Sequence, residues 1–130
     1  MYSTVQTDLE TYFKNNWSAT AIDWENSPLD STELKEYVRF AIQFGDSESK
    51  GLGRKCFRTV GVAFVQVFVR PSSGAARLME LSTIAANLFK TDSIGDCVFT
   101  SGPSLTKQYN DADGWVQALV ATDFYFDEVI

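Results

Sequence analysis

The stretch Phe57-Arg58-Thr59-Val60-Gly61-Val62-Ala63-Phe64-Val65-Gln66-Val67-Phe68-Val69-Arg70 has the composition of a long β-strand. It is rich in β-branched and aromatic residues, which strands favour. Through its centre it is apolar on both faces, which is typical of a buried strand. We predict that it lies in the centre of a sheet with one side under a helix. Gly61 is unusual inside a strand and predicts a bulge or close packing at this position.

The residues before this stretch predict a helix, two further strands and a loop. Residues 3–17 place their apolar side chains on one helical stripe, and residues 21–25 alternate as a half-buried strand does. Residues 36–44 alternate strongly, with Tyr37 and Arg39 on the wetter face. Residues 45–55 combine charges, serines and three glycines. We therefore expect a loop there that stays mobile until a partner binds it.

The residues after this stretch predict a second helix and more strands. The helix follows Pro71 and runs to about Phe89 or Lys90, and the strands cover residues 94–101, 104–109 and 114–126. Residues 110–114 have the composition of a hairpin turn. The order α-β-β-β-α-β-β-β predicts one α+β domain spanning residues 1–130. It consists of a mixed, largely antiparallel twisted sheet with two helices packed on it.

Size and charge limit the possible partners. A chain of 130 residues with 45% hydrophobic residues suits one globular core. Eleven basic and 17 acidic side chains give a net charge of −6, which repels nucleic-acid phosphates, so no nucleic-acid specificity is expected. Apolar runs are too short for a membrane helix, and no signal peptide is evident at Met1, so we expect a cytoplasmic protein without a membrane partner.

Residue types that carry catalysis are scarce. The chain has no histidine, which removes the commonest general base and metal ligand. The glycine-rich residues 51–55 lack the spacing of a phosphate loop and precede a strand rather than a helix. Cys56 and Cys97 are far apart and are expected to be free thiols, although the fold could bring them together. We therefore predict no catalytic site, no metal and no cofactor.

The sequence resembles the tail terminator proteins of long-tailed bacteriophages, which include lambda-like minor tail proteins. The resemblance spans nearly the whole chain and rests on the order of its elements together with particular residues at familiar offsets. These are the strand end at residues 24–29, the strand at residues 36–42, Arg58 and Gly61 in residues 58–69, Gly74 at the start of a helix that ends in residues 84–89 with Phe89, residues 102–104, and the terminal strand at residues 115–126.

This resemblance implies a virion structural protein that is not an enzyme. Subunits of that family join in a ring, expected to be a hexamer, which caps the finished tail tube, stops its polymerisation and offers a docking face to the head. The implied partners are copies of this chain, the tail tube protein and a head-completion or connector protein. The implied location is the virion tail, with assembly in the cytoplasm of a host bacterium.

Candidate contact residues follow from charge and placement. A ring needs two different patches on each subunit, and opposite charges can fix the register between them. Exposed aromatic residues can anchor such contacts. The candidates are Tyr37, Arg39, Lys50, Arg54, Lys55, Arg58, Trp115, Asp123, Tyr125, Asp127 and Glu128, with the basic cluster set against the acidic residues near the C-terminus.

Two alternatives remain open on the sequence. The chain could be a small-ligand-binding or enzymatic α+β barrel, which would require a deep cavity with convergent polar groups. Gln66, Thr122 and Asp123 are the few buried polar candidates on the strands. The chain could also be another neck or tail-tube component.

Overall fold

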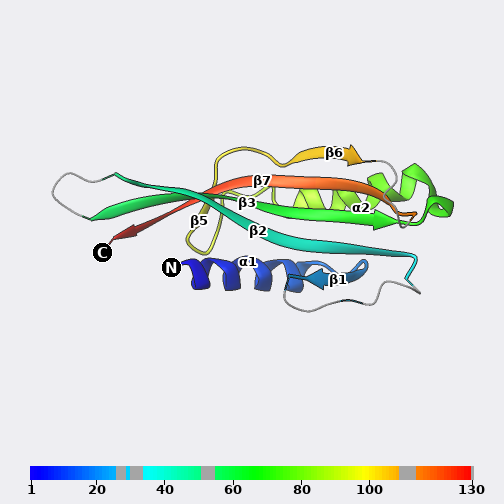
Figure 1. Cartoon of the computed structure of the whole chain (residues 1–130), viewed down its shortest axis with the longest axis horizontal. Coiled ribbons are helices and arrows are strands. Elements are labelled where there is room, and N and C mark those ends of the chain that lie inside the picture. The colour runs from blue at the N-terminus through cyan, green and yellow to red at the C-terminus, as the bar shows by residue number, and fades with distance from the viewer. Residues whose placement is uncertain (26–28, 30–33, 51–54, 109–113, 130) are drawn as a thin grey trace.

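The computed structural model describes residues 1–25, 29, 34–50, 55–108 and 114–129 (Figure 1). Within these residues the chain forms the helices α1 (Tyr2–Asn16) and α2 (Gly74–Leu88) and a short 3-10 turn (Pro71–Ser73). The strands are β1 (Ala21–Trp24), β2 (Glu36–Ser49), β3 (Cys56–Val69), β4 (Ser93–Ile94), β5 (Cys97–Phe99), β6 (Ser104–Gln108) and β7 (Val116–Val129).

The strands share one sheet in the order β1-β2-β3-β7-β5-β4, and β6 also pairs with β7. β1 runs parallel to β2, while the other pairs are antiparallel. The long apolar strand β3 lies between β2 and β7, which confirms the predicted central position in the sheet. The predicted fold class, an α+β fold with a mixed and largely antiparallel sheet, is confirmed.

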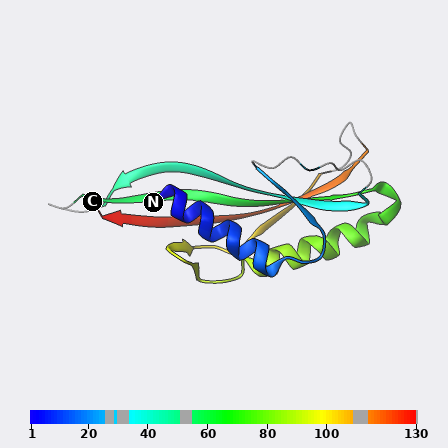
Figure 2. The same ribbon diagram turned by 90° about the horizontal axis from the view of Figure 1, so that it is seen from below.

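One face of the sheet carries the main core. α1 and α2 lie on the same side of the sheet (Figure 2). Phe13 of α1 stacks on Phe40 of β2 at 4.8 Å between ring centroids, and on Phe89 at 6.3 Å. This face, called the covered face below, holds most of the buried apolar area and so most of the folding energy. The helix residues buried on it are Val5, Leu9 and Phe13 from α1, and Leu78, Leu81, Ser82 and Ala85 from α2.

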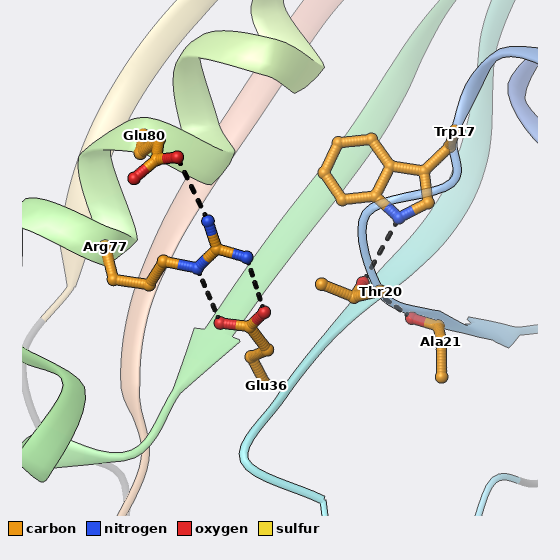
Figure 3. Close-up of polar contacts among 6 residues, drawn as sticks. All are labelled: Trp17, Thr20, Ala21, Glu36, Arg77 and Glu80. Carbon is orange, nitrogen blue, oxygen red and sulfur yellow. Dashed lines mark hydrogen bonds and ion pairs between the residues drawn. The ribbon is translucent and has the colours of Figure 1, made fainter.

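An ion pair fixes α2 to the sheet (Figure 3). Arg77 of α2 donates two hydrogen bonds to Glu36 at the start of β2, at 2.6 and 2.8 Å. It donates a third to Glu80, one turn further along the same helix, at 3.1 Å. Arg77 therefore links the helix to the first residue of β2.

Short-range hydrogen bonds shape the turn between α1 and β1 (Figure 3). Trp17 donates its indole N–H to the Thr20 hydroxyl at 3.1 Å, and that hydroxyl donates to the Ala21 carbonyl at 2.9 Å. The Trp17 ring also stacks on Phe13 at 5.4 Å. The end of α1 is thus held against the core while the chain turns into β1.

Residues 45–49, which were expected in a loop, belong instead to β2. The pairing with β3 shifts between Phe44 and Ser47 and then continues, with Glu48 opposite Arg58. This bulge and the cross-strand pairs override the low strand propensity of glycine, serine and aspartate. Of the rest of the predicted loop, the structure describes Lys50 and residue 55 as exposed and outside the strands, while residues 51–54 lie outside the described residues.

Gly61 is explained by close packing. A side-chain carbon at Gly61 would lie 2.5 Å from the ring of Phe124 on the neighbouring strand, so the ring occupies the space of the missing Cβ. The bulge lies next to it, on the paired strand β2.

The predicted single strand at residues 94–101 is corrected. It is a tight hairpin of β4 and β5, in which Ile94 pairs with Cys97. Gly95 in the turn adopts a φ of +57°, a conformation that glycine reaches without strain.

Candidate interaction surface

The face of the sheet opposite the helices is called the outer face. β2, β3 and β7 contribute to it every second residue, in rows that run across the three strands. The composition of these rows changes from aromatic through apolar to charged along the strands. From one end the rows are Tyr37–Phe68–Gln117, Arg39–Gln66–Leu119, Ala41–Phe64–Ala121 and Gln43–Val62–Asp123, followed by Val60–Tyr125 and Glu48–Arg58–Asp127.

The aromatic end of the outer face is buried. Tyr37 stacks on Phe68 at 4.5 Å, and Trp115 meets Tyr37 edge-on at 5.0 Å. Leu29 and Leu34 pack against this group, which leaves Tyr37 6% and Trp115 3% exposed. The expectation that both side chains stand on a wet face is therefore wrong. Periodicity assigned them to the correct face but could not reveal that Leu29 and Leu34 cover it.

Arg39 lies beside this group and is already engaged. It pairs with Asp23 of β1 at 2.9 Å, and its guanidinium carbon lies 5.3 Å from the centre of the Phe68 ring. Gln66, in the same row as Arg39, donates a hydrogen bond to Gln117 of the adjacent row at 2.6 Å. These contacts hold β1, β2, β3 and β7 together on the outer face.

The middle of the outer face is apolar and partly open. Ala41, Phe64, Leu119 and Ala121 are half-buried, and Val60 is 47% exposed. Antiparallel sheets can leave one face in water, but that face then normally carries polar residues. An uncovered apolar strip of this kind is typical of a contact site rather than of a solvated surface.

At the charged end of the outer face, two of the candidate residues form an ion pair within the chain. Arg58 donates two hydrogen bonds to Asp127, at 2.8 and 2.9 Å, and its guanidinium carbon lies 4.0 Å from the centre of the Tyr125 ring. The hydrogen bonds from Arg58 lower the pKa of Asp127 and, in turn, raise the pKa of Arg58. The basic cluster and the acidic C-terminal residues were expected to face each other across subunits, but these two side chains meet within one subunit.

A groove lies between the apolar strip and this ion pair. It has a volume of about 670 Å³ and opens to the surface. Its floor includes Val60 and Val62, with Asp123 and Tyr125 beside them. Its other lining residues are Gln43, Phe44, Gly45, Arg58, Gly61, Thr100 and Phe124.

Two further predicted contact residues, Lys50 and Glu128, already have ionic partners. Lys50 pairs with Glu48 at 3.2 Å, and Glu128 lies 3.7 Å from the terminal amino group of Met1. Arg54 lies outside the described residues.

Lys55 and Asp123 differ from the other charged candidates. Both are exposed, and neither forms an ion pair with another described residue. The structure thus brings Arg58, Tyr125 and Asp127 together and places Asp123 at the groove, with its charge unmatched within the described chain.

The groove was not predicted from the sequence. Gln43, Val60, Val62 and Thr100 were not candidates, although all four lie in segments that were predicted as strands. The available signal was the apolar character of both faces of β3, which indicated burial under a second layer. On the outer face, the described part of the chain provides that layer only over the aromatic end.

The three polar candidates of the ligand-binding or enzymatic alternative do not converge in this groove. Thr122 is buried on the covered face, whereas Gln66 and Asp123 lie on the outer face. Among the described residues no cluster of three or more cysteine, aspartate or glutamate side chains could hold a metal ion. Cys56 and Cys97 are free thiols, as expected, and burial raises the pKa of Cys97 to about 12, which keeps it protonated and unreactive.

Neither helix in the described part of the chain is long and apolar enough to cross a membrane.

Comparison with known proteins identifies the fold but assigns no function. No protein-family model matches the chain. No curated protein matches it. Solved structures do match, and one of them covers 95% of both chains with a TM-score of 0.67 at 16% sequence identity. The name of that structure states no function. At this identity the likeness shows a shared fold and nothing more about activity or partners.

Proposed function

We propose that this protein is a structural component of a phage or prophage tail. Its subunits associate in a closed ring by contact alone, without catalysing a reaction, and the ring caps the tail tube and joins it to the head. The tail assignment rests on the sequence resemblance described above. The observation that carries the assembly role is the outer face, where an apolar strip and a groove stay uncovered by the described chain.

The shape of the molecule supports assembly. β2, β3 and β7 extend beyond the N-terminal end of α1 (Figures 1 and 2). Tyr2, at the start of α1, packs on Phe44 and Phe126, and Phe126 pairs with Thr59, so residues 46–49, 56–58 and 127–129 lie past the helix. We call these residues, together with Lys55 immediately before β3, the arm. A short group of strands without a helix layer is a weak structure by itself, and a neighbouring subunit would supply the missing layer.

The rival function, a ligand-binding or enzymatic domain, predicts a deep cavity with convergent polar groups. The groove has a ligand-sized volume, but it is open and its floor is apolar. Such a surface suits a protein partner better than a small metabolite. We therefore keep assembly as the proposed function.

The test is direct self-association. The purified protein, studied by sedimentation velocity and negative-stain electron microscopy over a wide concentration range, is expected to form closed rings. Added to purified tail tubes of a long-tailed phage, it is expected to bind at one end of the tube. A protein that stays monomeric at every concentration and never binds tubes would refute the proposal. Formation of rings that do not bind tail tubes would refute the tail assignment but not the assembly role.

A further inference from the structure

Within the proposed ring, we infer that the arm of one subunit lies in the groove of the next, with Lys55 of the first against Asp123 of the second. This inference rests on the proposed function and adds to it the two patches that meet. The occupant of the groove is therefore a second copy of this chain.

The charges of the groove favour a cationic occupant. Arg58 is held by Asp127 through two hydrogen bonds, so its positive charge is already matched. Asp123, two residues before Tyr125 on β7, is exposed and forms no ion pair with another described residue. A positive group placed above Val60 and Val62 would complement this carboxylate while its aliphatic stem covered the apolar floor.

The arm of the same chain ends in such a group. Lys55 stands immediately before β3, is exposed, and makes no ion pair among the described residues, whereas Lys50 is paired with Glu48. Lys55 cannot reach Asp123 of its own groove. Seven residues of extended chain separate Lys55 from Val62, the cross-strand partner of Asp123. That is about 23 Å at about 3.3 Å per residue, which exceeds the reach of a lysine side chain. The contact must be made between subunits.

The two patches also have the relation that a ring needs. The groove and the end of the arm are different surfaces of one chain. Each subunit can therefore contact one neighbour through its arm and the other neighbour through its groove. Repeated head-to-tail contacts of this kind close into a ring when the rotation between neighbours permits. The same contact would cover the uncovered strands of the arm and the apolar floor of the groove together.

Charge reversal with rescue tests the pairing. Asp123→Lys alone and Lys55→Asp alone each place like charges at every contact, and we expect each to weaken self-association at least about tenfold. An equimolar mixture of the two variants should restore closed rings. In an alternating ring, one contact pairs the two substituted side chains and the next pairs the native Asp123 with the native Lys55, so opposite charges meet at both. Lys107→Asp, which reverses an exposed lysine on β6 that does not line the groove, is the matched control.

The readouts are the dissociation constant from sedimentation velocity and the fraction of closed rings in electron micrographs. Thermal unfolding of each variant verifies the fold, and Val60→Ser provides a second, uncharged change in the groove floor with the same expected loss of association. If the wild type forms rings and both charge variants assemble as well as the wild type, the inference is wrong, whereas the proposed ring assembly is unaffected. Failure of the mixture to rescue two defective variants also overturns it. A wild type that never self-associates removes the proposed function together with this inference.

Discussion

The covered face and the outer face are built by the same three strands, yet they differ in how their side chains are used. On the covered face Phe40, Val65 and Val120 are almost wholly buried beneath α1 and α2. On the outer face the corresponding middle positions Phe64 and Leu119 are half-buried. Neighbouring residues of one strand therefore occupy a finished core on one side and an incomplete one on the other.

This difference teaches that apolar periodicity shows which faces favour burial, but not whether the chain itself covers them. β3 is apolar on both faces, the composition of a strand that is buried on both. The chain supplies helices for one face and, on the other, Leu29 and Leu34 over the aromatic end alone among the described residues. The remaining strip has the character of an interface whose second layer comes from another molecule.

The largest expected effect is on the covered face. Phe13 is fully buried and stacks on both Phe40 and Phe89. Phe13→Ala should lower the free energy of unfolding by about 3–5 kcal/mol, since it removes a large buried ring and leaves a cavity. Urea denaturation followed by far-UV circular dichroism measures this change.

The matched control is Leu119→Ala on the outer face. Because Leu119 is half-buried in the monomer, its truncation should cost less than about 2 kcal/mol in the unfolding free energy. If both variants lost the same free energy of unfolding as monomers, the two faces would be equally buried.

A smaller effect is expected at Gly61, where the Phe124 ring packs closely against β3. In Gly61→Ala the new methyl group would lie 2.5 Å from the Phe124 ring, which must shift within a packed core. We expect a loss of about 1–3 kcal/mol in the unfolding free energy. Gly102→Ala is the control, because apart from the adjacent residues of the chain no heavy atom lies within 4 Å of the place that its new methyl group would take. A neutral Gly61→Ala would mean that the ring has room to move.

Most of the fold was predictable from local patterns. The alternation in residues 36–44 and the apolar run of β3 give β2, β3 and their central position, and the stripe in residues 3–17 gives α1 within one residue at each end. Residues 45–49 were misassigned because their strand state depends on pairing with β3, which is decided by contacts distant in sequence. The β4–β5 hairpin was missed because a single glycine, Gly95, makes its turn.

The candidate surface was predictable to a lesser degree. Alternation placed Tyr37, Trp115 and Tyr125 on the outer face, and charge selected Arg58 and Asp127. Whether a residue on that face is buried, paired or open depends on the register between strands and on the path of the loops. Register alone brings Arg58 opposite Asp127, and no property of either residue taken singly predicts it.

The smallest expected effect concerns the ion pair at the margin of the covered face. The hydrogen bonds from Arg77 lower the pKa of Glu36 below its ordinary value. A carboxyl with a lowered folded pKa stabilises the protein above its unfolded pKa of about 4.3 and loses this contribution as the pH falls through the folded value.

Glu36→Gln should therefore lower the free energy of unfolding at pH 7 by at most about 1 kcal/mol, because the pair is partly exposed to solvent. The difference in the free energy of unfolding between wild type and variant should decrease as the pH falls below about 4. It should vanish once Glu36 is protonated in the folded state. Urea denaturation of both proteins across the acidic to neutral range measures it. Glu80→Gln, which removes a more exposed and single contact to the same arginine, should show a smaller gap. A gap that is independent of pH would mean that Glu36 acts through packing rather than through its charge, and that the covered face is fixed to α2 by apolar contacts alone.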